Sequence, residues 1–203
     1  MIFSEKNINF DHLTNLILNG SVFCYPTETL YGIGCIYSNQ DSITKIFNIK
    51  NRNVKQKMSL LFKDFEMLND LFYINALEKK IIKTFLPGKL SILLEPKKSD
   101  NFNENLVGDN GKISCRISSH DFVINLFSKI NFPIISTSAN VSGNQNIYNS
   151  SFLINEFSSK VDFIVDYGDI KESKGSTIIN IVNNNVNLLR EGDIPSKEIM
   201  EVI

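Results

Sequence analysis

Short apolar runs alternate with amphipathic segments along this 203-residue chain, and this alternation limits the fold more than any other feature of the sequence. Runs rich in Val, Ile and Phe are typical of buried strands, whereas apolar residues spaced three and four apart are typical of helices. We expect strands at 21–25, 58–62, 89–95, 112–117, 134–135 and 161–165, and a hairpin of 176–182 with 186–190. We expect helices at 9–19, 40–50, 68–85 with a break near Asn75, 118 or 119 to 130, 149–157, and from Pro195 onward. This order predicts an α/β fold with a mixed, twisted sheet, helices packed on it and polar loops at the strand ends.

The length fits a single domain, so residues 1–203 are expected to form one unit with a sizeable core. Hydrophobic residues make up 42% and charged residues 21%, which is ordinary for a soluble globular protein. The net charge is −1, from 21 Lys and Arg against 22 Asp and Glu, so any basic site must be local. No apolar run reaches the ~20 residues of a membrane span, and the first residues lack the pattern of a signal peptide. We therefore expect a cytoplasmic protein with no membrane partner.

Cysteine and histidine are too few and too scattered to suggest a metal centre. Cys24, Cys35 and Cys115 lie in apolar stretches with no C-x-x-C pair, which favours buried, reduced thiols over disulfides or zinc ligands. His12 and His120 are the two histidines of the sequence, so we expect no metal site built from histidines.

The most informative stretch follows Pro133, where the apolar pair at 134–135 gives way to small and polar residues at 136–143. A strand that only had to fold would continue in Val, Ile or Leu, whereas this row offers hydroxyls, backbone N–H groups and one carboxamide. Such groups can surround an anion or a hydroxylated ligand. A Ser- and Asn-rich turn held by local hydrogen bonds is the alternative that the stretch leaves open. If the chain stays extended, Ser136 and Ser138 point to the same side of the strand.

Two other polar stretches follow apolar ones. At 26–34 a strand gives way to hydroxyls, a carboxylate and two glycines, Gly32 and Gly34, which either let backbone approach a ligand or form a bulge. Residues 50–57 carry four positive charges, which is typical of a solvated loop or of a phosphate clamp.

Arg116 lies among apolar residues of an expected strand, so its guanidinium needs an anionic partner. A structural salt bridge and a ligand carboxylate are the two possibilities. The polar stretch 96–110 is the best candidate for a mobile flap. The sequence contains neither G-x-x-x-x-G-K-[ST] nor G-x-G-x-x-G, so a bound nucleotide would be held by scattered basic and hydroxyl groups.

A set of motifs occurs in a fixed order between Pro26 and Asp193. Its members are P-T-E-T-L-Y-G-I-G at 26–34, K-x-R at Lys50 and Arg52, L-P-G at 86–88, R-x-x-x-H at Arg116 and His120, S-T-S-A-N-V-S-G at 136–143, G-S-T at 175–177 and L-R-E-G at 189–192. This ordered set resembles the YrdC/TsaC family, the threonylcarbamoyl-AMP synthases. The resemblance implies a YrdC-like twisted mixed sheet flanked by helices, with a concave basic cleft.

The resemblance also implies a reaction in which L-threonine, bicarbonate and ATP become threonylcarbamoyl-AMP and pyrophosphate. That product is the intermediate for N6-threonylcarbamoyladenosine in tRNA, so the implied partners include downstream tRNA threonylcarbamoyl transferase proteins. Whether tRNA itself binds is left open. Negative charge would develop on phosphate oxygens during the reaction. The protein therefore needs cations and hydroxyl donors around these oxygens, and needs little covalent catalysis by a nucleophile of its own.

Carried over position by position, the resemblance implies a set of site residues. L-Threonine would be held by Thr29, Arg116, Ser136 and Ser176, with Arg116 forked onto the threonine carboxylate. ATP would be held by Arg52, Gln56, Lys112, Ser138, Asn146 and Arg190, and the catalytic role of neutralising its phosphates would fall to Lys50 and Arg52. Mg²⁺ is expected to travel with ATP, because the chain lacks a dense set of carboxylates for the ion.

The chain departs from the family pattern in the basic loop. Asn53 stands where a proline is usual, Lys57-Met58 replaces Pro-Leu, and Lys89 replaces the second proline of Pro-Gly-Pro. The extra C-terminal domain of longer members is expected to be absent, because the chain is too short to hold it. Two other functions remain open: a non-catalytic RNA-binding protein of the same fold, and a carbamoyl-transfer module for another acceptor.

Overall fold

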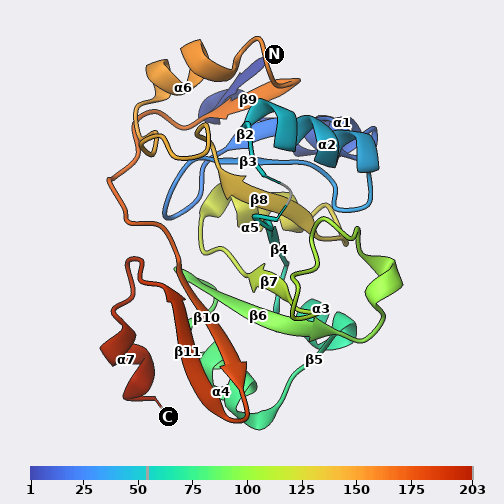
Figure 1. The fold of residues 1–203 in the computed structure, drawn as a ribbon. Helices are drawn as coiled ribbons and strands as arrows, with labels where there is room; N and C mark the ends of the chain where they lie inside the picture. Colours follow the sequence, from blue (N-terminus) through green and yellow to red (C-terminus); the bar gives the residue numbers. More distant parts are fainter. Residues whose placement is uncertain (54, 203) are drawn as a thin grey trace.

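One path of hydrogen-bonded strands organises the chain in the computed structural model, which describes residues 1–53 and 55–202 (Figure 1). The strand order is β1-β9-β2-β3-β8-β4-β7-β6-β10-β11, with β5 paired to β6 outside this path. Four neighbouring pairs are parallel (β1 with β9, β2 with β9, β4 with β7, β6 with β10), and the others are antiparallel. The predicted mixed sheet is therefore confirmed. The strands are β1 (Ile2–Ser4), β2 (Phe23–Tyr25), β3 (Gly32–Gly34), β4 (Ser59–Leu61), β5 (Phe72–Tyr73), β6 (Leu90–Pro96), β7 (Ile113–Arg116), β8 (Ile134–Ser138), β9 (Phe163–Asp166), β10 (Thr177–Val182) and β11 (Asn185–Arg190).

Helices cover both faces of the sheet. Successive strand residues point to opposite faces, and the central strands carry apolar side chains on both, so each face needs a cover. Ile134 packs in a cluster with residues of α1 and α5, whereas its neighbour Ile135 packs in a larger cluster with residues of α2, α4 and α6. The break expected near Asn75 is real, since Asn75 caps α4 in a capping box with Glu78. The helices are α1 (Phe10–Leu18), α2 (Gln40–Ile49), α3 (Phe65–Leu71), α4 (Ala76–Phe85), α5 (Asp121–Phe127), α6 (Ser150–Phe157) and α7 (Ser196–Met200).

Strand β8 lies in the middle of the sheet and continues three residues beyond the predicted strand end at 135. Ser136 pairs with Ser59 of β4, while Thr137 and Ser138 pair with Ile33 and Gly32 of β3. The backbone ladder continues although the side chains become polar, since the ladder bonds involve only main-chain groups. The polar row is therefore extended, as the alternation of Ser136 and Ser138 requires.

Three further expectations differ from the structure. His120, rather than Ser118 or Ser119, caps α5, because its Nδ1 accepts the Phe122 N–H at 3.1 Å, and α5 ends at Phe127 rather than at Ile130. The stretch 96–110 is anchored in the core through Phe102 and Leu106, which are buried. The three short strands β1, β3 and β5 were not predicted, because each has too few residues for a recognisable periodicity.

Candidate active site

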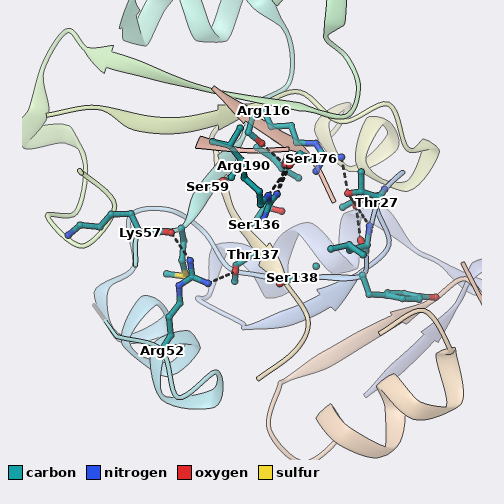
Figure 2. Close-up of a pocket in the computed structure, with 18 residues that line it drawn as sticks. Thr27, Arg52, Lys57, Ser59, Arg116, Ser136, Thr137, Ser138, Ser176 and Arg190 are labelled. Atoms are coloured by element: carbon teal, nitrogen blue, oxygen red, sulfur yellow. Dashed lines mark hydrogen bonds between the residues drawn. The ribbon is translucent and has the colours of Figure 1, made fainter. Parts of the chain in front are cut away.

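The strand ends around β8 enclose a pocket with a cavity volume of about 130 Å³ (Figure 2). Its lining residues come from β3, β4, β6, β7, β8, β10 and β11 and from the loops before β3, β4 and β10. In Figure 2 Arg52 and Lys57 approach the pocket from one side, and Arg116, Arg190 and Ser176 from another. The lining residues are Thr27, Thr29, Leu30, Tyr31, Gly32, Arg52, Lys57, Met58, Ser59, Leu61, Ser91, Arg116, Ser136, Thr137, Ser138, Ser176, Ile178 and Arg190.

The lining is cationic and rich in hydroxyl groups, and none of its members is an Asp or a Glu. Its cations are Arg52, Lys57, Arg116 and Arg190. Burial and the charge of Arg190 lower the pKa of Arg52, and burial and the charge of Arg116 lower the pKa of Arg190. Arginine remains charged despite such shifts, so the pocket concentrates positive charge in a molecule whose net charge is −1. An anionic ligand is the natural occupant.

Arg116 ends β7 and is held from three directions. Its Nε donates to the Gly88 carbonyl at 3.0 Å, and its Nη2 donates to Thr29 Oγ1 at 3.0 Å. Nη2 also lies 2.9 Å from Glu28 Oε1, which supplies the anionic partner that the sequence predicts for this residue. Nη1 makes no hydrogen bond within residues 1–53 and 55–202, so it is the group left for a ligand. A carboxylate fork that used Nη2 would have to share that group with Glu28.

Arg52 folds the basic loop back toward the pocket. Its Nε donates to the Gln56 carbonyl at 2.7 Å and its Nη2 to the Lys57 carbonyl at 2.8 Å. Its Nη1 lies 3.4 Å from Thr137 Oγ1, at the outer limit of a hydrogen bond. The side chain therefore shapes its own loop and reaches β8 at the same time. Val54, in the middle of this loop, lies outside the described residues.

Arg190 and Ser176 form the opposite wall. Arg190 donates to the Ser176 carbonyl from Nε at 3.0 Å and from Nη2 at 2.6 Å, and Nη2 also lies 3.0 Å from Ser176 Oγ. Ser176 Oγ lies 2.9 Å from Ser91 Oγ of β6, so the register of β6 with β10 sets its position. The structure thus brings Arg190 and Ser176 together with Thr29, Arg116, Ser136, Ser138 and Arg52, as the sequence predicts.

Lys50 lies behind the pocket rather than in its lining. Its side chain is fully buried, and its ammonium donates to the carbonyls of Ser138 and Asn140 and to Asn140 Oδ1. Burial, together with the nearby charge of Arg52, lowers the pKa of Lys50 to about 7. Three acceptors surround the ammonium, so Lys50 does not face the pocket directly in this structure, and its role in neutralising the phosphates of ATP stays a prediction. Lys50 instead fixes the turn after β8, where Ser138 Oγ donates to Asn140 Oδ1 at 2.6 Å.

Three other predicted ATP-binding residues also lie outside this lining. Gln56 is exposed and contributes its carbonyl to Arg52. Lys112 Nζ donates to the Ile181 carbonyl at 2.7 Å and lies 3.7 Å from Glu78 Oε1, so its side chain turns away from the pocket. Asn146 lines a second cavity of about 690 Å³. That cavity is lined by Asn140, Val141, Asn144 to Asn149, Phe152, Glu156 and Glu172.

Sequence reasoning missed several residues that the fold brings to the site. Ser59 and Ser91 line the pocket, and Glu28 stands behind it against Arg116. Lys57, part of the predicted phosphate clamp, also lines the pocket. Ser59 follows the basic loop directly, which was an available signal. Ser91 reaches the pocket only because β6 pairs with β10, which no local pattern reveals.

The two glycines of β3 serve strand packing. A Cβ on Gly34 would lie 2.1 Å from the Ile135 carbonyl oxygen, and one on Gly32 would lie 3.2 Å from the Tyr25 ring. Gly34 therefore allows β8 to approach β3 closely. The close neighbour of Gly34 is thus a strand, which is neither the ligand nor the bulge that the sequence suggests.

The donor set of the pocket suits phosphate better than a protein-held cation. Among the described residues no group of three or more His, Cys, Asp or Glu side chains could hold a metal ion. The lining offers Mg²⁺ hydroxyl oxygens but no carboxylate, whereas protein-bound Mg²⁺ usually has one or two carboxylate ligands. The residues therefore do not fit a resident Mg²⁺. Over the described parts of the chain, the structure also contains no helix long and apolar enough to span a membrane.

Comparisons with known proteins agree with this architecture. A family model named Sua5, YciO and YrdC, described as telomere recombination, matches residues 15–192. The chain is 34% identical over 195 residues to a Methanocaldococcus jannaschii protein provisionally named threonylcarbamoyl-AMP synthase, with 96% of this chain and 91% of that protein covered. It is 31% identical over 172 residues to the threonylcarbamoyl-AMP synthase of Buchnera aphidicola, with 83% of this chain and 96% of that protein covered.

Among solved structures, Pyrococcus abyssi Sua5 in complex with L-threonine superposes with a TM-score of 0.91 at 26% identity. The superposition covers 100% of this chain and 61% of that protein. This chain therefore spans about three fifths of that Sua5 protein.

Proposed function

Because the chain belongs to the Sua5/YciO/YrdC family, we propose that it is an L-threonylcarbamoyladenylate synthase. In the reaction, bicarbonate carboxylates the amine of L-threonine with loss of water. A carbamate oxygen then attacks the α-phosphorus of ATP. The bond from that phosphorus to the oxygen bridging to the β-phosphorus breaks, and the electron pair leaves with pyrophosphate.

The observation that carries this proposal is the convergence of three arginines on one pocket whose described lining contains many hydroxyls and no carboxylate. Transfer of an adenylyl group places negative charge on the phosphate oxygens and on departing pyrophosphate. Fixed cations and hydroxyl donors around those oxygens stabilise the transition state without a covalent intermediate. The arrangement therefore suits a reaction that depends on positioning and charge.

The threonine end of the pocket is formed by Thr29, Arg116, Ser136 and Ser176. Arg116 Nη1 is free to receive the threonine carboxylate, while Nε and Nη2 keep the guanidinium in place. Ser136 and Ser176 supply further hydroxyls from the lining of the same pocket. A substrate held in this way presents its amine toward Ser138, where the nucleotide is expected.

The nucleotide end is formed by Arg52, Ser138 and Arg190. Lys50 acts as a positioning residue there, because it holds the turn that follows Ser138. A cavity of about 130 Å³ is small beside the roughly 300–1,000 Å³ of typical ligand sites. The second cavity begins at Asn140, whose Oδ1 accepts from Ser138 Oγ, so the two cavities adjoin there. We place the nucleoside part of ATP toward that second cavity, next to Asn146. Gln56 and Lys112 keep an ATP role only if their side chains move from the positions described above.

Mg²⁺ enters this proposal as part of the ATP substrate, held by its phosphates and water. The product would pass to tRNA threonylcarbamoyl transferase proteins, which attach it to tRNA. Threonine, bicarbonate and ATP are the substrates of the proposed reaction itself.

Exchange of radiolabelled pyrophosphate into ATP, measured without RNA, tests the proposal. We expect exchange that requires both L-threonine and bicarbonate, and that falls at least about tenfold when L-serine, L-valine or L-alanine replaces threonine, since a polar site discriminates against missing groups. Exchange with no preference for threonine would favour a carbamoyl-transfer module for another acceptor. Absence of exchange together with RNA binding would favour the non-catalytic RNA-binding function.

A further inference from the structure

The three pocket arginines differ in their partners. Arg116 is paired with a carboxylate, Glu28, at 2.9 Å. Arg52 donates to the carbonyls of Gln56 and Lys57, and Arg190 donates to the carbonyl and hydroxyl of Ser176. Among the described residues neither Arg52 nor Arg190 forms an ion pair. The charge of Arg116 is therefore partly neutralised, whereas Arg190, on the same side of the pocket, and Arg52, on the other side, keep their full positive charge.

Glu28 is itself firmly held. Its Oε2 accepts a short hydrogen bond from Ser118 Oγ, and 13% of its side chain is exposed, against 9% for Arg116. Burial raises the pKa of Glu28, but the charge of Arg116 and the hydrogen bonds from Ser118 and Arg116 lower it more, so the carboxyl is ionised at neutral pH. Glu28 is absent from the pocket lining, so it acts on a ligand through its pairing with Arg116 and through its charge rather than by direct contact.

We propose that Glu28 is a positioning residue that sorts the two substrates, by reserving the Arg116 end of the pocket for a zwitterionic amino acid and leaving phosphate to Arg52 and Arg190. This inference rests on the proposed function. An amino acid carries one carboxylate and one amine. Its single carboxylate can bind Nη1 of Arg116, although the charge of Arg116 is already shared with Glu28. A phosphate group carries up to two negative charges and is repelled by the nearby carboxylate of Glu28.

The physical basis is the low solvent exposure of the pair. Charges a few ångströms apart interact more strongly where protein partly excludes water than they do in bulk water. A fixed carboxylate beside Arg116 therefore lowers the affinity of that end for a polyanion more than its affinity for a ligand with a single carboxylate. Discrimination of this kind depends on a repulsive element as much as on an attractive one.

Threonine binding in the presence and absence of inorganic pyrophosphate tests the inference. We expect calorimetry on the wild-type protein to show a threonine Kd that saturating pyrophosphate changes by less than about twofold. In Glu28→Gln, pyrophosphate should reach the unpaired Arg116 and raise the apparent threonine Kd at least about fivefold, about 1 kcal/mol. A damaged fold weakens threonine binding but does not create new competition by pyrophosphate. The quantity compared is the ratio of the threonine Kd with pyrophosphate to the Kd without it. The same ratio in Glu28→Gln and wild type would overturn the inference.

Three variants keep the test decisive. Glu28→Asp retains the charge and should keep the wild-type ratio. Ser118→Ala removes the hydrogen bond that holds Glu28 and should give an intermediate ratio, which provides the test if Glu28→Gln does not fold. Ser119→Ala, at the neighbouring exposed serine, is the matched control and should behave as wild type. A wild-type ratio in Ser118→Ala, or competition in Glu28→Asp as strong as in Glu28→Gln, would contradict the proposal.

The inference and the proposed function fail in different ways. If the wild-type protein binds no threonine, the proposed function is wrong and the inference falls with it. If threonine binds and the pyrophosphate ratio is unchanged by Glu28→Gln, only the sorting role of Glu28 is wrong.

Discussion

The ammonium of Lys50 donates a 2.7 Å hydrogen bond to the main-chain carbonyl of Asn140, although 90 positions separate the two residues in the sequence. The same ammonium also reaches the Ser138 carbonyl and Asn140 Oδ1. One buried cation thus fixes the turn that presents Ser138 to the pocket. Lys50 acts from behind the site, and its predicted contribution is to geometry rather than to direct phosphate contact.

Replacing Lys50 with Met should lower kcat/KM for ATP by about 100-fold, because misplacement of a catalytic group by about 1 Å can reduce the rate that much. Met fills similar space without donating to the three oxygens. Lys55, an exposed lysine in the same loop, provides the control, and Lys55→Met should retain activity within about twofold, since exposed charges contribute little. Equal losses in both variants would show that only the overall charge of the loop matters.

The same lysine should give folding stability a dependence on pH. Burial and the charge of Arg52 lower the pKa of Lys50 from 10.5 to about 7, so the unfolded chain binds more protons between these values. The free energy of unfolding should therefore rise as pH increases through this window. Denaturant unfolding between about pH 6 and about pH 8.5 should show a smaller rise for Lys50→Met than for wild type, below the range where buried cysteines would ionise. Identical pH dependence in the two proteins would contradict the assignment.

Arg116→Lys should weaken threonine binding by at least about tenfold and change ATP binding by less than about threefold. A lysine ammonium cannot bind Gly88, Thr29 and Glu28 at once and still offer a planar group to a carboxylate. Arg190→Lys is the matched variant, for which the larger change should be in ATP affinity. The two affinities can be measured separately by calorimetry. Equal losses of both affinities in Arg116→Lys would make Arg116 a structural residue.

Ser136 and Ser138, on the same strand, should each bind a different substrate, Ser136 threonine and Ser138 ATP. Both line the pocket, and they are two residues apart on β8. Ser136→Ala should raise the KM for threonine at least about tenfold with little effect on ATP, whereas Ser138→Ala should impair use of ATP and leave threonine binding largely unchanged. Loss of one hydrogen bond to a charged group corresponds to about 1.5–3 kcal/mol, or roughly 10- to 100-fold. Full activity of Ser138→Ala would mean that the Ser138 hydroxyl has no role in the use of ATP.

The sequence reveals the parts of this fold that local patterns determine. Helix α2 and the hairpin of β10 and β11 follow from the spacing of apolar residues and from turn residues, and Asn183 and Asn184 adopt the positive φ values that this hairpin turn needs. The sequence also predicts that Ser136, Ser138 and Arg116 gather in one pocket, and they do. Strand ends alone do not explain this, because β7 and β8 flank β4 and run in opposite directions.

Long-range pairing accounts for what the sequence does not reveal. The Glu28 and Arg116 ion pair joins residues on β7 and on the loop before β3, which become neighbours only through the order of the strands. The burial of Lys50 depends in the same way on the turn after β8. Helix caps such as His120 are equally hard to predict, because Ser118 and Ser119 have the commoner capping side chains.

The central claim is that threonine, bicarbonate and ATP react in this one pocket, and the fate of radiolabelled bicarbonate tests it most directly. We predict that the purified protein incorporates the label into an adenylate only when L-threonine, bicarbonate and ATP are all present, in a yield matched by released pyrophosphate. Arg116→Lys and Ser138→Ala should both reduce this incorporation. Adenylate that forms without bicarbonate, or no labelled adenylate when all three substrates are present, would contradict the account.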